Sequence, residues 1–411
     1  MSRAVVLGAA LLLLAGAVLA LDAAFGPDTV TYHGEVSRVL EDNCVSCHRE
    51  GGIAPFSWRE YEVARARASM IPTVLAEGRM PPWFASPEHG EWANERRLRE
   101  EERRVLLEWV EAGAPEGDPE DAPEPREFVD GWQLGEEPDT VIRLPEPQQV
   151  PAEGVVPYRY VHVKTDYSED RWIQKAELRP TGTEVAHHAI VFQEGPDAER
   201  RGPWVVGWAP GVPPSQFPEG TGKLLPAGGW LTFQLHYTTM GNPATDRTEL
   251  ALVFADEKPS RRVRTRSVGT TEFEIPAGAE NHEVVAELEF ERPGKILSLL
   301  PHMHYRGKAF RYELIRPDGT EEILLEVPNY DFDWQLSYVA EEPIRVDSGA
   351  VLRGRAWYDN SADNPRNPDP TEAVSYGQQS FDEMMFGFFE WVPSRNETGS
   401  AADRADAGTT R

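Results

Sequence analysis

The sequence predicts a multidomain protein: an α-helical N-terminal domain followed by two antiparallel β-sandwich domains of the jelly-roll kind. Its 411 residues exceed the length of one ordinary domain. The 34 glycines and 35 prolines indicate many turns, which favours β architecture over helix bundles. The pattern also changes after residue 127, from helical periodicity to short β-rich runs separated by turns. These three observations fix the order of the predicted domains.

The first segment is predicted to direct export. Arg3 precedes an apolar run over residues 4–20, and Val18 and Ala20 occupy the small-residue positions before a cleavage site. We therefore interpret residues 1–20 as a signal peptide and expect a periplasmic or secreted protein. An uncleaved anchor is the alternative, although the run is slightly short for a full span. Because no later run is long and apolar enough, we expect no membrane span after cleavage.

Residues 21–113 are predicted to form the helical domain. Within residues 94–113 the apolar side chains recur on one helix face, and Gly113 ends the pattern (Leu98, Val105, Leu106, Trp109 and Val110). Residues 114–131 are acidic and rich in proline, so we expect a solvated linker. Such a linker raises the effective concentration of one domain beside the next.

The remaining chain is predicted to fold as two sandwiches, over residues 132–258 and 259–393. Runs such as GWLTFQLHYTT, AFRYELI and VLRGRAWY are short, β-rich and bounded by Pro and Gly. Residues 394–411 are small, polar and charged, which predicts a disordered tail.

Composition excludes several classes of function. The formal net charge is -28, from 41 Lys and Arg against 69 Asp and Glu. Phosphate backbones need a basic face, so we expect no nucleic-acid partner. With two cysteines, Cys44 and Cys47, a disulfide-rich scaffold is also excluded.

Both cysteines lie in the run Cys44-Val45-Ser46-Cys47-His48, the C-x-x-C-H pattern of c-type haem attachment. Two thiols on one helical turn reach both vinyl groups of a porphyrin, and the adjacent His48 then faces the iron. A dithiol redox pair is the alternative, but its usual βαβ context is missing from the sequence. The sequence therefore predicts one covalent haem c.

The second axial ligand of this haem is predicted to be Met80. In Arg79-Met80-Pro81-Pro82-Trp83 the prolines favour an extended loop that points the thioether at the iron. Met70 and His89 compete for this role, although a methionine within a helix is more often a core residue. The stretch from Cys44 to Gly113 resembles a cytochrome c domain, and ligation by His and Met would favour electron transfer.

Five histidines and a methionine form a second set in the β region. They are His187 and His188 in VAHHAIVF, His236 in FQLHYTT, His302 and His304 in LLPHMHYRG, and Met384 in DEMM. On a strand, His302 and His304 project to one face, whereas His187 and His188 meet at one site only at a strand end or bulge. Imidazoles with a thioether suit copper in both oxidation states. Isolated structural histidines are the alternative interpretation.

The order HH, QxHY, HxH and DEM resembles the copper type II, ascorbate-dependent monooxygenases, the family of the peptidylglycine α-hydroxylating and dopamine β-monooxygenases. The resemblance covers residues 132–391 and implies two coppers. His187, His188 and His236 would hold the electron-transfer copper, and His302, His304 and Met384 the copper that reacts with O₂. Met385 replaces Met384 if the register slips by one residue. His162 and His282 match no motif and are interpreted as structural.

Two departures from this family bear on the substrate. Where the peptidylglycine enzyme carries an Arg and a Tyr that hold a substrate carboxylate, this chain has Leu300 and Phe388. The pocket is therefore expected to be more apolar, and a C-terminal glycine is a poor substrate. The β region also lacks the disulfides of the animal enzymes, so its stability depends on its core.

These features together predict an exported haem- and copper-dependent monooxygenase that hydroxylates a C–H bond with O₂. In the family that this chain resembles, ascorbate reduces both coppers. Here the fused haem domain is expected to relay electrons to the coppers, with ascorbate or a redox protein as the electron donor. The alternatives are a non-catalytic electron-transfer or copper-binding protein on the same fold, and a haem sensor. Neither the substrate nor the physiological reductant follows from the sequence.

Overall fold

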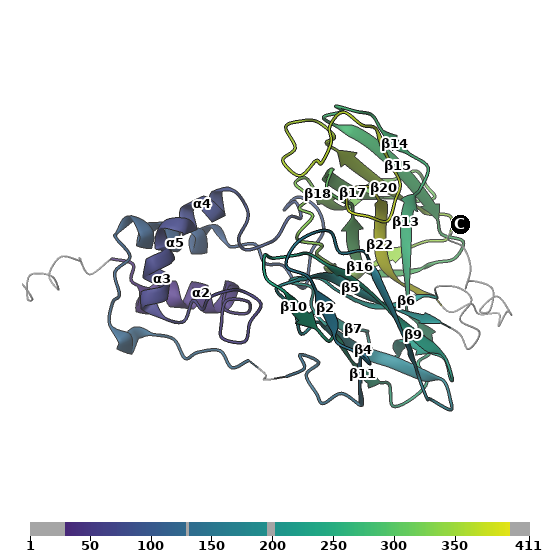
Figure 1. Ribbon diagram of the computed structural model, residues 1–411, viewed down its shortest axis with the longest axis horizontal. Helices are drawn as coiled ribbons and strands as arrows, with labels where there is room; N and C mark the ends of the chain where they lie inside the picture. Colours follow the sequence, from purple (N-terminus) through teal and green to yellow (C-terminus); the bar gives the residue numbers. More distant parts are fainter. Residues whose placement is uncertain (1–28, 129–130, 195–201, 395–411) are drawn as a thin grey trace, which may run out of the picture. The chain divides into compact units, whose positions relative to one another are not determined.

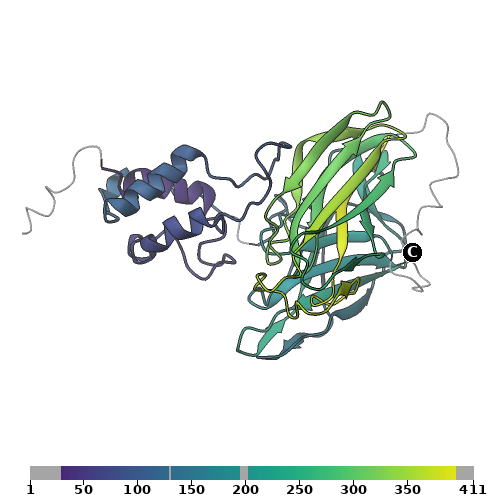
Figure 2. The same cartoon turned by 90° about the horizontal axis from the view of Figure 1, so that it is seen from above.

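The computed structural model describes residues 29–128, 131–194 and 202–394. The predicted signal segment and residues 395–411 of the predicted tail lie outside the described residues. The chain forms two compact units. One, here called the helical unit, comprises the described residues up to 81 and residues 96–128. The other, the β unit, comprises residues 82–95 and the described residues from 131 onward (Figures 1 and 2).

The helical unit is built from short helices. They are η1 (Tyr32–Val36), α2 (Ser37–Asn43), α3 (Tyr61–Arg67), η2 (Ala68–Met70), α4 (Ile71–Ala76), α5 (Glu100–Glu111) and η3 (Pro119–Asp121). Their apolar faces meet in a small core that includes Leu40, Leu75 and Leu106. At its centre lies the fully buried Trp109, whose indole Nε1 donates to the carbonyl oxygen of Pro115 at 2.9 Å. The core fixes the end of α5 against the chain that follows it.

The first half of the β unit contains two packed antiparallel sheets. One sheet has the strand order β1-β11-β4-β8-β12, in which β12 pairs in parallel with β8 and β7 also pairs with β4. The other sheet has the order β3-β9-β5-β6. Their bounds are β1 Thr140–Arg143, β3 Arg159–Lys164, β4 Arg171–Arg179, β5 Ala186–Glu194, β6 Trp204–Trp208, β7 Ser215–Gln216, β8 Thr221–Leu225, β9 Trp230–Tyr237, β11 Glu249–Phe254 and β12 Arg261–Arg262. Buried residues of both sheets, such as Ile173 and Phe233, share one hydrophobic cluster.

The second half repeats this arrangement with two four-stranded sheets, β13-β22-β16-β19 and β15-β20-β17-β18. Their bounds are β13 Arg264–Thr270, β15 His282–Glu289, β16 Gly294–His302, β17 Gly307–Ile315, β18 Glu321–Val327, β19 Tyr338–Val346, β20 Val351–Tyr358 and β22 Met385–Pro393. Two short pairs complete the unit: β2 (Gln148–Val150) with β10 (Ala244–Asp246), and β14 (Glu274–Ile275) with β21 (Val374–Ser375).

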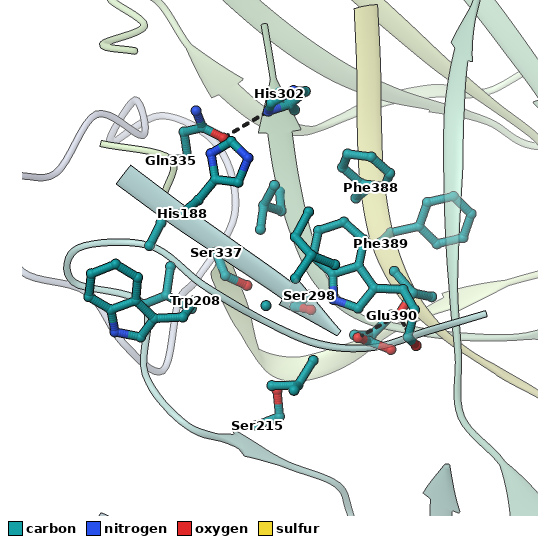
Figure 3. A pocket seen from close by; sticks show the side chains of 18 of the residues that line it. His188, Trp208, Ser215, Ser298, His302, Gln335, Ser337, Phe388, Phe389 and Glu390 are labelled. Atoms are coloured by element: carbon teal, nitrogen blue, oxygen red, sulfur yellow. Dashed lines mark hydrogen bonds between the residues drawn. The ribbon is translucent and has the colours of Figure 1, made fainter. Parts of the chain in front are cut away.

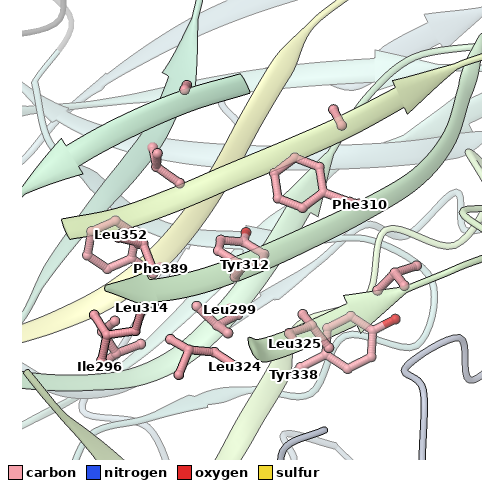
Figure 4. Packing of buried hydrophobic residues seen from close by; sticks show 14 of the residues in the cluster. Ile296, Leu299, Phe310, Tyr312, Leu314, Leu324, Leu325, Tyr338, Leu352 and Phe389 are labelled. Atoms are coloured by element: carbon pink, nitrogen blue, oxygen red, sulfur yellow. The ribbon is translucent and has the colours of Figure 1, made fainter. Parts of the chain in front are cut away.

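Strand alternation explains the core of this second half. Along β20, buried and half-buried residues alternate over all eight positions, because successive side chains point to opposite faces. Phe310, Tyr312 and Leu352 from one sheet and Leu299 and Phe389 from the other meet in the cluster shown in Figure 4. The opposite face of β22 is thereby left to line a pocket.

Residues 82–95 belong to the β unit although they interrupt the helical part of the sequence. Trp92 forms an antiparallel bridge with Ala340, and the Asn94 side chain bonds both the Ser337 carbonyl oxygen (2.8 Å) and the Val339 amide (2.9 Å). The rings of Trp83 and Trp92 contact the ring of Tyr338 edge-on, at 4.9 and 5.6 Å between centroids. This segment therefore extends the edge of β19.

The predicted fold class is wrong. Strands hold 38% of the described residues and helices 12%, and these residues contain no α-helical cytochrome domain. The longest of the short helices is the 12-residue α5. In place of the expected fold class with its α-helical cytochrome domain, the described molecule is mostly β-sheet, with many sheets. Helical periodicity in the sequence overstated the helices, because turns with proline and glycine lie on both sides of the short helices α3, η2 and α4.

Among the described helices, none has the length and apolar character needed to cross a membrane.

Candidate metal centre

The first histidine group lies where β5 meets β9. His188 is the cross-strand partner of His236, and the ladder is irregular between Ala186 and His188. This β-bulge turns His187 to the same side as His188, as the adjacent pair requires for a joint site. The potential ligand atoms of His187, His188 and His236 all lie within 4.8 Å of one another.

The second group lies at the end of β16. His302 is the last residue of this strand, and His304 follows in the turn, with 5.3 Å between the two ring centroids. His302 pairs with Phe386 of β22, so Met384, two residues earlier, lies just before the start of that strand. All three predicted ligands of this group are thus contributed by two neighbouring strand ends.

The two groups are close to each other. The ring centroids of His188 and His302 are 6.2 Å apart. Phe332 stacks on His187 at 4.4 Å and lies 6.2 Å from His304, so it fills the space beside both groups. The five imidazoles therefore converge on one region of the β unit.

Burial keeps these histidines neutral, which is the state that binds metals. Desolvation lowers the pKa of His187 and His302 to about 4 and that of His236 to about 3. For His188 and His304 the pKa also falls well below its ordinary value, first through burial and then through the neighbouring histidines. At neutral pH the region offers unprotonated imidazole nitrogens.

Hydrogen bonds leave particular ring nitrogens available. The Nδ1 atom of His302 lies 2.8 Å from Gln335 Oε1, and that of His304 lies 3.3 Å from the carbonyl oxygen of Asp382. Since a carbonyl oxygen can only accept, each Nδ1 carries the proton and each Nε2 keeps its lone pair.

Three ring nitrogens of this region are buried and have no hydrogen-bond partner among the described residues: His187 Nε2, His236 Nδ1 and His304 Nε2. Buried polar atoms without partners are rare and need an explanation. Bound metal ions supply one, because an ion at each histidine group would accept the lone pairs of that group. The donor set of imidazoles and a thioether fits copper.

Glu383 holds the two ligand-bearing segments together. Its carboxylate is fully buried and accepts hydrogen bonds from the backbone amides of His304 (2.9 Å), Arg306 (2.6 Å) and Met384 (3.2 Å). Burial raises the pKa of Glu383 to about 8, against the opposing effects of these amides and the Arg306 guanidinium. In the sequence this residue stands out only as part of the DEM motif, because its role depends on contacts with residues 77 and 79 positions away.

The structure separates the two candidate methionines. Met384 is half-buried and lines the pocket described below, whereas Met385 is fully buried in the hydrophobic core. Of the two candidate methionine ligands, Met384 is therefore the residue that lies on the side of the histidines.

A cavity of about 780 Å³ opens beside the histidines (Figure 3). His188, His302 and Met384 contribute to its wall, together with Gln335. Leu300 and Phe388 line it as well, and its volume suits a small molecule. Aromatic rings dominate the rest of the wall, including Trp204 and Trp208.

Other histidines of the β unit have structural partners. His162 Nδ1 lies 2.8 Å from Thr232 Oγ1, and His89 Nε2 lies 3.8 Å from Glu326. Gln234 of the QxH motif donates from Nε2 to the Tyr160 hydroxyl at 2.8 Å. No sequence motif marks Gln335, which bonds His302 although the two residues are 33 positions apart.

The predicted haem residues lie in the helical unit. Cys44 and Cys47 are free and half-buried. The backbone amides of Cys47 and His48 both donate to the Cys44 carbonyl oxygen, so the motif forms one tight turn. The His48 ring packs against Phe56 at 4.5 Å between centroids, and its Nδ1 is buried without a partner among the described residues. Burial lowers the pKa of His48.

The candidates for the second axial ligand differ in exposure. Met80 is half-buried at the end of the helical unit's first segment, whereas 53% of Met70 is exposed. His89, the third candidate, lies in the β unit.

Comparison with known proteins identifies no family. No family model matches the chain, and no curated protein matches it. Among solved structures, the major capsid protein of bacteriophage PM2 is similar at a TM-score of 0.25 and 9% identity, covering 62% of this chain and 100% of its own. PBCV-1 VP54, fitted into a reconstruction of the virophage Sputnik, gives 0.26 and 6%, covering 64% and 96%. Scores this low carry no argument about fold or function.

Proposed function

We propose that this protein is an exported copper-dependent monooxygenase that inserts one oxygen atom of O₂ into a C–H bond of a small molecule. One observation carries the proposal: five neutral imidazoles, four of them buried and that of His187 half-buried, converge beside a thioether at the wall of an apolar pocket. Three orphaned ring nitrogens support a metal there, and the soft donor set favours copper over zinc.

Copper bound to these residues would supply the redox chemistry that activates O₂. His187, His188 and His236 would hold one ion, and His302, His304 and Met384 the other. The protein's own contribution is to orient these ligands. Gln335 fixes the tautomer of His302, the Asp382 carbonyl fixes that of His304, and Glu383 ties the His304 turn to the Met384 segment.

The pocket walls would exclude water and present the substrate. Aromatic side chains surround the space next to His302 and Met384, and an apolar wall protects a reactive centre from solvent. The position of Leu300 and Phe388 in this wall favours an uncharged group over a carboxylate near the metal.

The test is metal analysis followed by oxygen uptake. We expect about two copper ions per chain, and O₂ consumption that depends on copper, a reductant such as ascorbate and an organic substrate. His236→Ala and His304→Ala should each remove one ion, whereas His282→Ala, outside both groups, serves as the matched control. Copper binding without substrate-dependent oxygen uptake would favour a copper-binding or electron-transfer protein.

We also propose that Cys44 and Cys47 carry one covalent haem c, with His48 as its proximal and Met80 as its distal ligand, which relays electrons to the copper. The C-x-x-C-H run and the predicted signal peptide support this proposal. Protein matured in a host that attaches c-type haem should show one haem by its pyridine haemochrome spectrum, and Cys47→Ala should weaken attachment. That variant should also lose turnover with a protein donor but keep ascorbate-driven turnover. Normal turnover with both donors would refute the relay.

A further inference from the structure

The pocket has a polar end as well as a candidate metal end. Beside β22, the side chains of Met384, Phe386, Phe388 and Glu390 follow one another along the pocket wall, because alternate residues of a strand share a face. His302 pairs with Phe386, at one end of this row. Glu390 lies at the other end of the row. It is four residues beyond Phe386, which corresponds to about 14 Å along a strand.

The sheet register gathers polar groups around Glu390. Its cross-strand partners are Thr265 on β13 and Ser298 on β16, and both also line the pocket. One row nearer the histidines, Phe388 pairs with Ser267 and Leu300. Figure 3 shows Ser298 and Glu390 on the side of the pocket away from His302.

A buried lysine balances the charge of Glu390. Lys223 is 4% exposed, and its Nζ donates to Glu390 Oε1 (2.8 Å), Thr265 Oγ1 (2.8 Å) and the Val205 carbonyl oxygen (2.7 Å). The second carboxylate oxygen, Glu390 Oε2, is buried and has no hydrogen-bond partner among the described residues. The pair is thus electrically neutral but keeps one unused acceptor.

The remaining wall between the two ends is aromatic. Trp204 approaches Phe388 from the facing sheet, with ring centroids 4.8 Å apart. Among the described residues that line the pocket, Glu390 is the one acidic side chain, and none is Lys or Arg. A charged substrate group would therefore lack a counter-ion: Lys223 already compensates Glu390, and a carboxylate would face its free oxygen.

We infer that the substrate is an elongated, mostly apolar and uncharged molecule, whose hydrogen-bond donor at one end is bound by Glu390 while its other end lies beside His302 and Met384. The reaction of this molecule rests on the proposed function. Its binding in the pocket does not depend on copper.

The experiment compares four ligands with the same apolar chain: 1-decanol, its methyl ether, decanoate and decylammonium. Binding to the full-length protein is measured by titration calorimetry, with and without added copper. Decanol should bind about tenfold more tightly than the ether, because only the alcohol donates to the carboxylate. Decanoate and decylammonium should bind more weakly than decanol.

A double variant, Lys223→Met with Glu390→Leu, removes the polar end without leaving a buried charge. It should bind the alcohol and the ether equally, with unchanged affinity for the ether. The matched control, Arg355→Met with Glu313→Leu, removes an ion pair outside the pocket (Nε–Oε2 3.0 Å) and should keep the preference.

Equal affinity of decanol and its ether in the unaltered protein would overturn the inference, even if the double variant failed to fold. Tightest binding of decanoate or decylammonium would overturn it as well, as would a preference that survives in a folded double variant. These outcomes are separate from copper binding. A protein that binds no copper but prefers decanol would refute only the proposed function.

Discussion

The side chains of Met384 and Met385 are adjacent in sequence but lie in different environments, and this difference gives a sharp test at a single residue. Met384 lines the pocket and Met385 is fully buried in the core. Because a thioether stabilises Cu(I), Met384→Leu should weaken Cu(I) binding by about tenfold, or ~1.4 kcal/mol.

Met385→Leu serves as the matched control, with unchanged Cu(I) affinity and a loss of stability below about 1.5 kcal/mol, as expected for a swap of similar volume. Competition with a Cu(I) chelator measures the affinities. The opposite pattern, with Met385→Leu alone losing Cu(I), would assign the ligand to Met385.

Each neutral buried histidine also makes stability depend on pH. Unfolded histidine titrates near 6.5, whereas burial lowers the pKa of His187 and His302 to about 4 and of His236 to about 3. Between these values the unfolded chain binds more protons, so the metal-free protein loses stability as the pH falls from about 6.5 toward 4. Glu383 has the opposite effect on stability between about pH 4.5 and 8, because its pKa is raised and the folded protein there binds more protons at this residue. The three histidines together outweigh this one group.

Urea unfolding of the copper-free protein at pH 6.5, 6.0, 5.5 and 5.0 measures this dependence. Each of the three histidines changes the free energy of unfolding by up to about 1.4 kcal/mol per pH unit, and relaxation of the protein around the site reduces this value. His236→Asn should flatten the slope, since it removes one of them. A slope that is flat in the unaltered protein, or equally steep in the variant, would contradict the argument.

Turns rather than strands hold the ligand-bearing elements in place. The His304 turn after β16 and the segment before β22 are joined by Glu383, whose two oxygens accept three backbone amides. Glu383→Ala leaves these buried donors unpaired, so we expect a loss of about 2–4 kcal/mol in the free energy of unfolding.

Copper retained at the site containing His302 and His304 should fall in the same variant, as measured by metal analysis after dialysis. Glu274→Ala, on the exposed edge of β14, is the control and should change neither quantity. Full retention of copper and stability by Glu383→Ala would show that β-sheet pairing alone positions the turn.

Part of the candidate site could be predicted from the sequence, and part could not. Local motifs were sufficient to single out the five histidines and Met384, because short spacings such as H-x-H follow directly from strand alternation. Glu390 and Lys223 could not be found in this way: they are 167 positions apart, and only the register of the sheets makes them neighbours. The packing of residues 82–95 could not be predicted either. These residues lie between helical segments in the sequence, but their tryptophans pack on Tyr338.

The fold class failed for a related reason. Hydrophobic periodicity marks apolar faces but not where proline and glycine end a helix, and it does not say how many sheets share one core. The predicted helical domain was therefore longer than the short helices observed.

At the scale of the whole molecule, two units with separate hydrophobic cores should unfold separately. The helical unit's core contains Trp109, and the clusters of the β unit contain Phe233 and Phe310. The candidate copper ligands all belong to the β unit, whereas Cys44, Cys47 and His48 belong to the helical unit. A ligand that binds only the folded state stabilises the unit that holds it, by about 2.7 kcal/mol at a concentration of 100 times its dissociation constant.

Differential scanning calorimetry should therefore show two transitions, and copper should raise the Tm of only one. Proteolysis at intermediate temperatures would identify which unit has melted. In the variant His187→Ala with His302→Ala, copper should no longer shift the transition of the β unit, because both ligand groups are incomplete. A single transition, or an equal copper-induced shift of both, would mean that the two units unfold as one cooperative body and that stability gained at the metal centre is shared with the C-x-x-C-H segment.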